Sequence, residues 1–138
     1  MTNDDLANTA NLFIAQRLVR KICTKCKEAH AATTAEKEII KKVLVNLKEK
    51  ETLTKKIRLF HGKGCTACSG TGFTGQMVIA ETMLIGKELS ELIARGALTS
   101  EIEEKATALG MITLLQDGIL AVLEGETSLD EVKRVTDL

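Results

Sequence analysis

Two cysteine pairs with the same internal spacing constrain this chain more than any other feature of its sequence. Two residues separate Cys23 from Cys26, two separate Cys65 from Cys68, and 38 residues lie between the pairs. Two intervening residues let a tight turn present both sulfurs to one ion about 2.3 Å away, and two such turns complete a tetrahedron. The pattern therefore predicts one metal site that joins two distant parts of the chain.

Zinc is the metal that four thiolates favour, and we expect a structural ion because a full thiolate set leaves no position for water. Gly64, Gly70 and Gly72 fit this interpretation, since such turns need positive φ angles. Another metal, such as iron in a rubredoxin-type site, is an alternative, as are cysteines that are only buried or redox-active. His30 or His61 could also replace one cysteine as a ligand.

The composition excludes several classes of function. The 19 basic and 19 acidic residues cancel, and the chain has three Phe but no Trp or Tyr. It therefore lacks the basic excess and the stacking platform of nucleic-acid-binding modules. The first residues have no signal-peptide pattern, and no apolar run is long enough to span a membrane. We expect a soluble cytoplasmic protein with reduced cysteines, no nucleic-acid partner and no direct membrane insertion.

The apolar periodicity predicts a mainly helical α+β fold with a small β element. Apolar residues at four-residue steps predict an amphipathic helix over 4–22. Thr33 and Glu36 form a capping box that predicts a second helix directly after it. Residues 56–60 and 77–85 are rich in β-favouring residues and are predicted to be strands.

From Gly86 onward the sequence predicts a bundle of four short helices with a small independent core. Glycines that follow apolar segments mark helix ends, and S-x-x-E boxes mark helix starts. The glycines are Gly96, Gly110 and Gly125, and the boxes are Ser100 with Glu103 and Ser128 with Glu131. We therefore divide the chain into a helix over 1–22, a zinc-stapled tetracysteine subdomain over 23–85 and a helical subdomain over 86–138.

Other motifs carry less weight. Residues 70–75, GTGFTG, match the dinucleotide fingerprint, but a cysteine turn precedes them and a predicted strand follows, so a glycine-rich turn is the better interpretation. One CxxCxGxG unit occurs, whereas DnaJ-type zinc domains repeat that unit four times. The sequence contains no Walker A motif and no apparent Ser/His/Asp or HExxH arrangement. We expect no catalysis by this chain itself.

Three segments appear in the order found in one known family. They are AQRLVRKICTKCKE at 15–28, GKGCTACSGTGFTGQMVIAE at 62–81 and ALGMITLLQDGILAVLEGETSLDEVKRVT at 108–136. Together they resemble the C-terminal region of the hexameric ATPases that power type II secretion and type IV pilus assembly. In that family a RecA-like motor domain with Walker boxes precedes a tetracysteine zinc subdomain and a helical tail.

The resemblance implies that Cys23, Cys26, Cys65 and Cys68 bind Zn²⁺. It also implies that the motor domain ends within residues 6–22, that Met1 begins a fragment, and that ATP binds only in the missing motor domain. The implied partners are the chain's own motor domain, neighbouring subunits of a hexamer, and inner-membrane platform proteins. Such a protein would be cytoplasmic and peripheral to the inner membrane.

The chain departs from the family pattern at two positions and matches it at two arginines. Gln76 and Ala80 stand where the family usually has an arginine and an aromatic residue. Arg17 and Arg20 match the family's QRLVR segment, and either act between subunits or lie on a solvated helix face. A freestanding zinc-ribbon adaptor that binds a protein partner or nucleic acid is the alternative to the ATPase interpretation.

Overall fold

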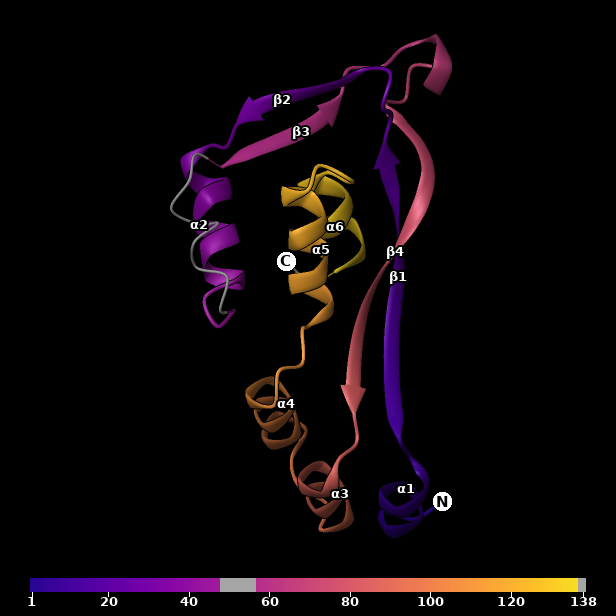
Figure 1. Ribbon diagram of the computed structural model, residues 1–138, viewed down its shortest axis with the longest axis vertical. Coiled ribbons are helices and arrows are strands. Elements are labelled where there is room, and N and C mark those ends of the chain that lie inside the picture. Colours follow the sequence, from indigo (N-terminus) through magenta and orange to yellow (C-terminus); the bar gives the residue numbers. More distant parts are fainter. Residues whose placement is uncertain (48–56, 137–138) are drawn as a thin grey trace. The chain divides into compact units, whose positions relative to one another are not determined.

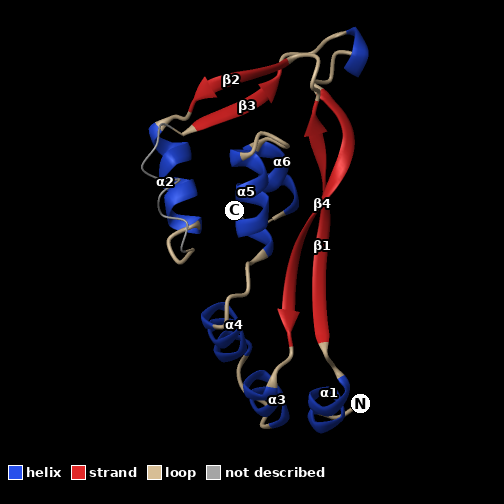
Figure 2. Cartoon of the chain, in the orientation of Figure 1, coloured by secondary structure: helices blue, strands red, loops and turns tan. Residues whose placement is uncertain are grey.

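The computed structural model describes residues 1–47 and 57–136, and this part of the chain has the predicted α+β fold (Figures 1 and 2). Its α-helices are α1 (Asn3–Thr9), α2 (Thr34–Val43), α3 (Lys87–Ala94), α4 (Thr99–Ala108), α5 (Leu114–Leu123) and α6 (Leu129–Val135). Its strands are β1 (Leu12–Ile22), β2 (Lys27–Ala31), β3 (Arg58–Gly62) and β4 (Phe73–Leu84). None of the helices in these described ranges combines the length and apolar character needed to cross a bilayer.

The helix predicted over 4–22 is wrong for most of its length. Only Asn3–Thr9 is helical, and Leu12–Ile22 forms strand β1, which pairs with β4. The error has a geometric cause. A step of four residues is even, so Ile14 and Leu18 share one face of a strand as well as one face of a helix. Pairing with β4, which lies far along the chain, makes this segment a strand instead of a helix.

Contacts group the described residues into two compact units, each built from two stretches of chain. One unit takes 1–16 and 80–113, and the other takes its residues from 17–79 and 114–138. The boundaries between these units differ from the subdomain boundaries predicted after residues 22 and 85. The predicted subdomains stay a prediction.

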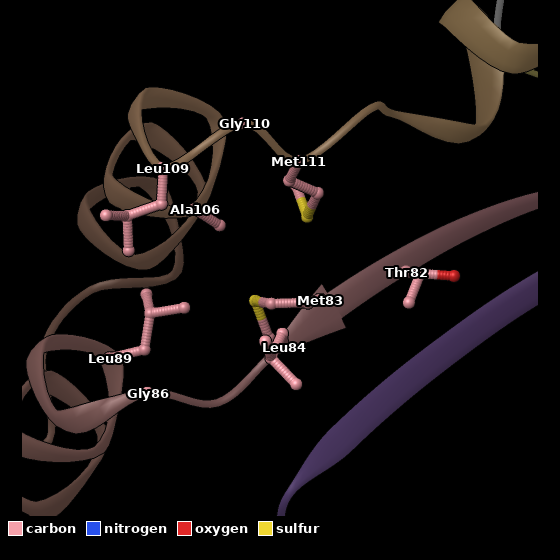
Figure 3. Close-up of a pocket in the computed structure, with 9 residues that line it drawn as sticks. All are labelled: Thr82, Met83, Leu84, Gly86, Leu89, Ala106, Leu109, Gly110 and Met111. Carbon is pink, nitrogen blue, oxygen red and sulfur yellow. The ribbon is translucent and has the colours of Figure 1, made fainter.

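The first unit contains α1, α3 and α4. Leu89 and Ile93 of α3 are buried, and the Ser90 hydroxyl donates to the backbone carbonyl of Ala7 in α1 at 2.8 Å. An apolar pocket of about 350 Å³ also belongs to this unit, and Met83 and Met111 line it (Figure 3).

The second unit holds the larger core, and both halves of the sequence contribute to it. Ile40 of α2 and Leu59 of β3 belong to the same buried cluster as Ile119 of α5 and Val132 of α6. The expectation that the C-terminal helices share an independent core is therefore wrong for α5 and α6. Close packing of these two helices depends on Gly118, where an added Cβ would lie 2.8 Å from a methyl group of Val132.

Strands β2 and β3 form an antiparallel pair in the second unit, with Lys27 opposite Gly62 and Ala31 opposite Arg58. The strand predicted over 56–60 is confirmed in its latter part, since β3 begins at Arg58 and residue 56 lies outside the described residues. Strand β2 was not predicted, because its segment KEAHA has no clear apolar alternation.

Two of the three predicted helix starts agree with the structure, and one does not. The Thr33 and Glu36 capping box is confirmed, with bonds of 3.3 Å to the Thr33 hydroxyl and 2.8 Å from the Thr33 N–H. The Ser100 and Glu103 box is wrong, because α4 begins earlier, at Thr99. Ser128 does cap α6, accepting from the backbone N–H of Glu131 at 3.3 Å.

The four helices predicted after Gly86 are present in the described residues as α3 to α6. The three predicted glycine stops, Gly96, Gly110 and Gly125, have positive φ and follow α3, α4 and α5.

Candidate metal centre

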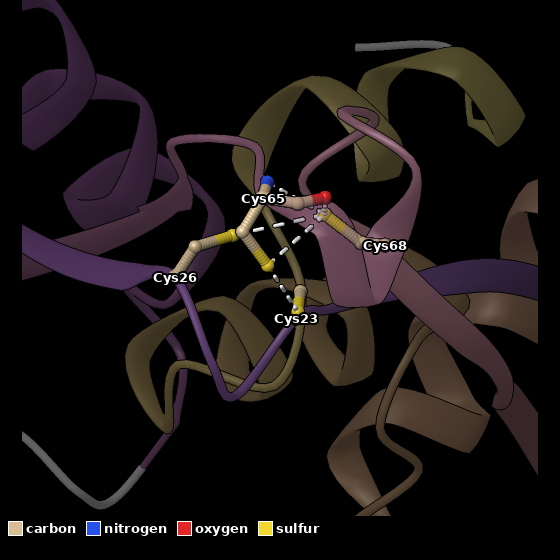
Figure 4. Close-up of side chains that lie close together, drawn as sticks. All are labelled: Cys23, Cys26, Cys65 and Cys68. Atoms are coloured by element: carbon tan, nitrogen blue, oxygen red, sulfur yellow. Dashed lines mark hydrogen bonds between the residues drawn. The ribbon is translucent and has the colours of Figure 1, made fainter.

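The four cysteine side chains predicted as ligands converge on one point (Figure 4). Their sulfurs all lie within 4.8 Å of one another, and no other His, Cys, Asp or Glu of the described residues joins this group. Cys23 directly follows β1, and Cys26 directly precedes β2. Cys65 and Cys68 lie in the connection between β3 and β4, where Thr66–Cys68 forms one turn of 3-10 helix. The strand pairs β1–β4 and β2–β3 thus bring together residues separated by about 40 positions.

The spacing of the sulfurs matches a tetrahedral zinc site. Sulfurs held about 2.3 Å from one ion at tetrahedral angles lie about 3.8 Å from each other. The Sγ atoms of Cys23 and Cys65 are 3.9 Å apart, as are those of Cys26 and Cys68. Cys65 Sγ and Cys68 Sγ are 3.7 Å apart. Both the donor set and its dimensions therefore fit Zn²⁺.

Backbone amides point at these sulfurs. The N–H groups of Cys65 and Gly72 each donate to Cys68 Sγ at 3.2 Å, and the Gly64 N–H donates to Cys26 Sγ at 3.3 Å. The Cys65 amide, together with the Gly72 amide and against the effect of burial, lowers the pKa of Cys68 to about 6. Because only thiolates bind zinc tightly, these amides favour the charge state that a metal needs.

The other thiols respond to opposing effects. Burial outweighs the Gly64 amide and raises the pKa of Cys26 to about 12. Burial also opposes ionisation of Cys23, but hydrogen bonds from the Lys25 amide and from neighbouring thiols bring its pKa below the ordinary value. Four adjacent sulfurs cannot all become anions unaided, so a cation is needed to hold the full thiolate set.

Glycine is required where the two turns meet. Gly64, Gly70 and Gly72 have φ angles of +92°, +78° and +79°, as predicted for cysteine turns. A Cβ on Gly72 would collide with the carbonyl oxygen of Gly62. The Gly72 carbonyl also accepts the backbone N–H of Cys23 at 2.9 Å, so this close approach connects the two cysteine pairs.

The two histidines lie on β2 and β3, outside the sulfur cluster. His30 and His61 contact each other, with their Nδ1 atoms 3.3 Å apart. Neither histidine replaces a cysteine among the grouped donor atoms of the described residues.

Arg20 lies on β1 three residues before Cys23, and its side chain is held from two sides. Its guanidinium donates to Glu131 at 2.6 Å and lies 4.3 Å above the ring of Phe73, while its backbone N–H donates to the same carboxylate at 2.9 Å. Arg134 donates to that carboxylate as well, at 2.8 Å. The suggestion of a solvated helix face for Arg20 is therefore wrong, because Arg20 is on a strand and binds the C-terminal helix α6.

The side chain of Glu131 has a different role from the one predicted from the sequence. It was predicted to cap its own helix, but its buried carboxylate instead accepts from Arg20 and Arg134. Burial alone would raise the pKa of Glu131, but the hydrogen bonds from both arginines outweigh it and lower the pKa to about 2. No local sequence signal points to this contact, which joins residues 111 positions apart.

Fold and donor set together describe an α+β protein with a tetracysteine centre between two strand pairs. The family described as "Type II/IV secretion system protein" matches residues 1–134, and the chain belongs to this family. The family resemblance seen in the sequence is thus confirmed.

Similar proteins include the type IV pilus assembly ATPase PilB of Thermus thermophilus, 36% identical over 86% of this chain and 13% of that protein. Type II secretion system protein E of Xanthomonas campestris pv. campestris is 36% identical over 96% of this chain and 22% of its own length. The type II secretion system ATPase E of Vibrio cholerae is 36% identical over 89% of this chain and 22% of its own length. The chain therefore spans less than a quarter of these relatives.

Proposed function

We propose that this chain is the zinc-stabilised C-terminal part of a hexameric ATPase that powers type II protein secretion or type IV pilus assembly. It acts in subunit contacts and in transmission of motor motion, and it catalyses no reaction by itself. The observation that carries the proposal is the family match over residues 1–134, together with four cysteine sulfurs within 4.8 Å of one another inside that match.

In this proposal Cys23, Cys26, Cys65 and Cys68 hold one structural Zn²⁺. The ion supplies a crosslink in place of a large core, and the amides of Gly64, Cys65 and Gly72 help to neutralise its thiolates. The crosslink fixes the end of β1 against the start of β4, while β2 begins and β3 ends at the same point. A movement of either long strand would then be transmitted to the helices of the second unit.

The proposed partners come from the family resemblance in the sequence, and the relatives support the motor domain because they are named as ATPases and are longer than this chain. We propose that ATP binds in a motor domain of the same protein, that neighbouring subunits contact this region in a hexamer, and that platform proteins of the inner membrane receive the motion. The protein would then be cytoplasmic and peripheral to that membrane. Residues 1–22, 23–85 and 86–138 would be the end of the motor domain, the zinc subdomain and the helical subdomain.

Metal content tests the zinc part of the proposal. Native mass spectrometry of the purified chain should show one Zn²⁺ per chain, and Cys65→Ser should abolish it. Thr66→Ser, at an exposed neighbouring position, is the matched control and should retain the ion. Iron in place of zinc, or full zinc content in the Cys65→Ser protein, would refute the assignment.

Activity of the complete protein tests the motor part. Cys65→Ser should lower ATP turnover and the population of hexamers while leaving nucleotide affinity unchanged, because the motor domain itself is intact. Equal turnover and assembly in the Cys65→Ser and Thr66→Ser proteins would exclude the transmission role. ATP at millimolar concentration should leave the NMR spectrum of the 138-residue chain unchanged, and nucleotide-specific shifts would show that the chain itself binds ATP.

A further inference from the structure

The chain has two histidines, and the fold brings them into contact. His30 on β2 and His61 on β3 are 31 positions apart in sequence, and their Nδ1 atoms approach to 3.3 Å. The ring centroids lie 5.3 Å apart at an interplanar angle of 63°. The two rings thus present one nitrogen each to a common point, in an edge-on arrangement rather than a stack.

The separation of the two nitrogens has the size that a shared metal ion requires. Imidazole nitrogens about 2.0 Å from a tetrahedral Zn²⁺ lie about 3.3 Å from each other. The strand register places a carboxylate on the same face, because Glu28 lies directly opposite His61 and two residues before His30. Lys63 now holds this carboxylate in an exposed ion pair of 3.1 Å, which a divalent cation could displace.

A second carboxylate lies near the other nitrogen of the His30 ring. Glu36 Oε1 lies 4.0 Å from His30 Nε2, and the backbone N–H of Thr33 holds the other oxygen of Glu36 at 2.8 Å. The Thr33 N–H bond outweighs burial and lowers the pKa of Glu36, so this group stays ionised near neutral pH. A carboxylate beside one imidazole nitrogen favours a proton there and leaves the lone pair on the other nitrogen free for a metal.

We propose that His30 and His61 bind a divalent transition-metal ion, Zn²⁺ in the first instance, through their Nδ1 atoms. Water completes the coordination, and Glu28 would join it only by leaving Lys63, because in the described residues its carboxylate does not form a three-ligand group with the two histidines. The site is separate from the four cysteines, and the inference does not rest on the function proposed above. The ion would connect β2 to β3, and it would bind more weakly than the cysteine-held ion because the histidines are partly exposed and the ligands are fewer.

A direct hydrogen bond between the rings is the competing explanation for their contact, and the two differ in where the protons lie. A hydrogen bond requires a proton on one of the two Nδ1 atoms. A metal bound by both Nδ1 atoms requires both ring protons on Nε2. The ¹⁵N chemical shifts of the ring nitrogens distinguish these states, and with two histidines in the chain every ring signal can be assigned.

The test uses the 138-residue chain loaded with one equivalent of Zn²⁺, whose place at the cysteines is checked by their ¹³Cβ shifts. A second equivalent is added during calorimetry and ring ¹⁵N spectroscopy at neutral pH. We expect one further binding event with metal-type shifts at both Nδ1 atoms. His61→Ala should remove this event or weaken it at least tenfold, and the cysteine shifts should not change.

Two variants of α2 form a matched pair. Glu36→Gln keeps the capping box, which accepts Gln, but removes the charge beside His30, so the second affinity should fall about tenfold. Glu38→Gln changes the same charge at an exposed position and should leave the affinity unchanged. Unchanged zinc affinity in His61→Ala, or no metal-type shift at either Nδ1, would overturn the proposal. So would a zinc-dependent doubling of mass in sedimentation, since it would show an ion bridging two chains.

Discussion

Replacing Glu131 by Gln should destabilise the fold well beyond what the loss of an ordinary surface ion pair does. The side chain of Glu131 is 3% exposed and accepts hydrogen bonds from Arg20 and Arg134. Its pKa falls from an ordinary 4.5 to about 2, and a difference of that size corresponds to about 3 kcal/mol. Because both guanidinium groups are about half exposed, water screens part of this interaction. We expect Glu131→Gln to lower the free energy of unfolding by about 2 kcal/mol.

Glu126→Gln is the matched control. Glu126 pairs with Lys21, the neighbour of Arg20, at 2.9 Å, but both side chains are more than 40% exposed. An exposed pair of this kind contributes about 0.5 kcal/mol. Urea unfolding of the three proteins at pH 7 in excess zinc, followed by circular dichroism, measures both losses. If Glu131→Gln costs no more than Glu126→Gln, the buried carboxylate does not stabilise the fold in the way argued.

The pH dependence provides a second check with a definite sign. The folded pKa of Glu131 lies below its unfolded value, so its contribution is complete above pH 4.5 and disappears as the pH falls towards 2. The gap in stability between the parent protein and Glu131→Gln should therefore be constant from pH 7 to about pH 5 and should narrow below that. A gap that widens on acidification would contradict the reasoning.

Three further substitutions test the helix packing, the helix cap and the glycine turn described above. Gly118→Ala should lower stability by about 1 kcal/mol in urea unfolding, because a Cβ 2.8 Å from a valine methyl of α6 overpacks the core by more than the helix gains; a more stable variant would contradict this. Thr33→Ala should cost about 1 kcal/mol through loss of the α2 cap, measured against exposed Thr34→Ala. Gly72→Ala should lower stability, and zinc affinity measured by chelator competition, far more than Gly75→Ala does. Both glycines have positive φ, but only at Gly72 would the added Cβ collide with backbone atoms. Equal effects of the two substitutions would exclude a steric role.

Features encoded within a few neighbouring residues could be predicted from the sequence. The Thr33 cap and the glycine ends of the later helices depend on local geometry, and the structure confirms them. The two CxxC turns are local as well, and the structure brings their four cysteines together, while their role as zinc ligands stays a prediction. Strand β1 could not be recognised, because its apolar steps of four suit a helix equally well and its partner β4 lies about fifty residues further on.

Contacts between distant residues explain the remaining differences. The sequence motif around Ser128 correctly indicated where α6 begins, but it could not show that the carboxylate of Glu131 binds Arg20 across 111 positions. The contact of His30 with His61 depends in the same way on the register of β2 and β3. Neither contact can be inferred until the elements that carry it, β1 with α6 and β2 with β3, are placed side by side.

The position of the cysteines has a consequence for how this region can change in length. The chain leaves the sulfur cluster at Cys26 and returns to it at Cys65, and the backbone N–H of Lys63 donates to the Cys26 carbonyl at 3.0 Å just before that return. The entropy of closing such an excursion grows only with the logarithm of its length, by about 0.6 kcal/mol for each doubling. Zinc affinity should therefore change little when residues are inserted away from the buried positions of α2 and β3, and this segment can lengthen or diversify while the end of β1 and the start of β4 stay in place.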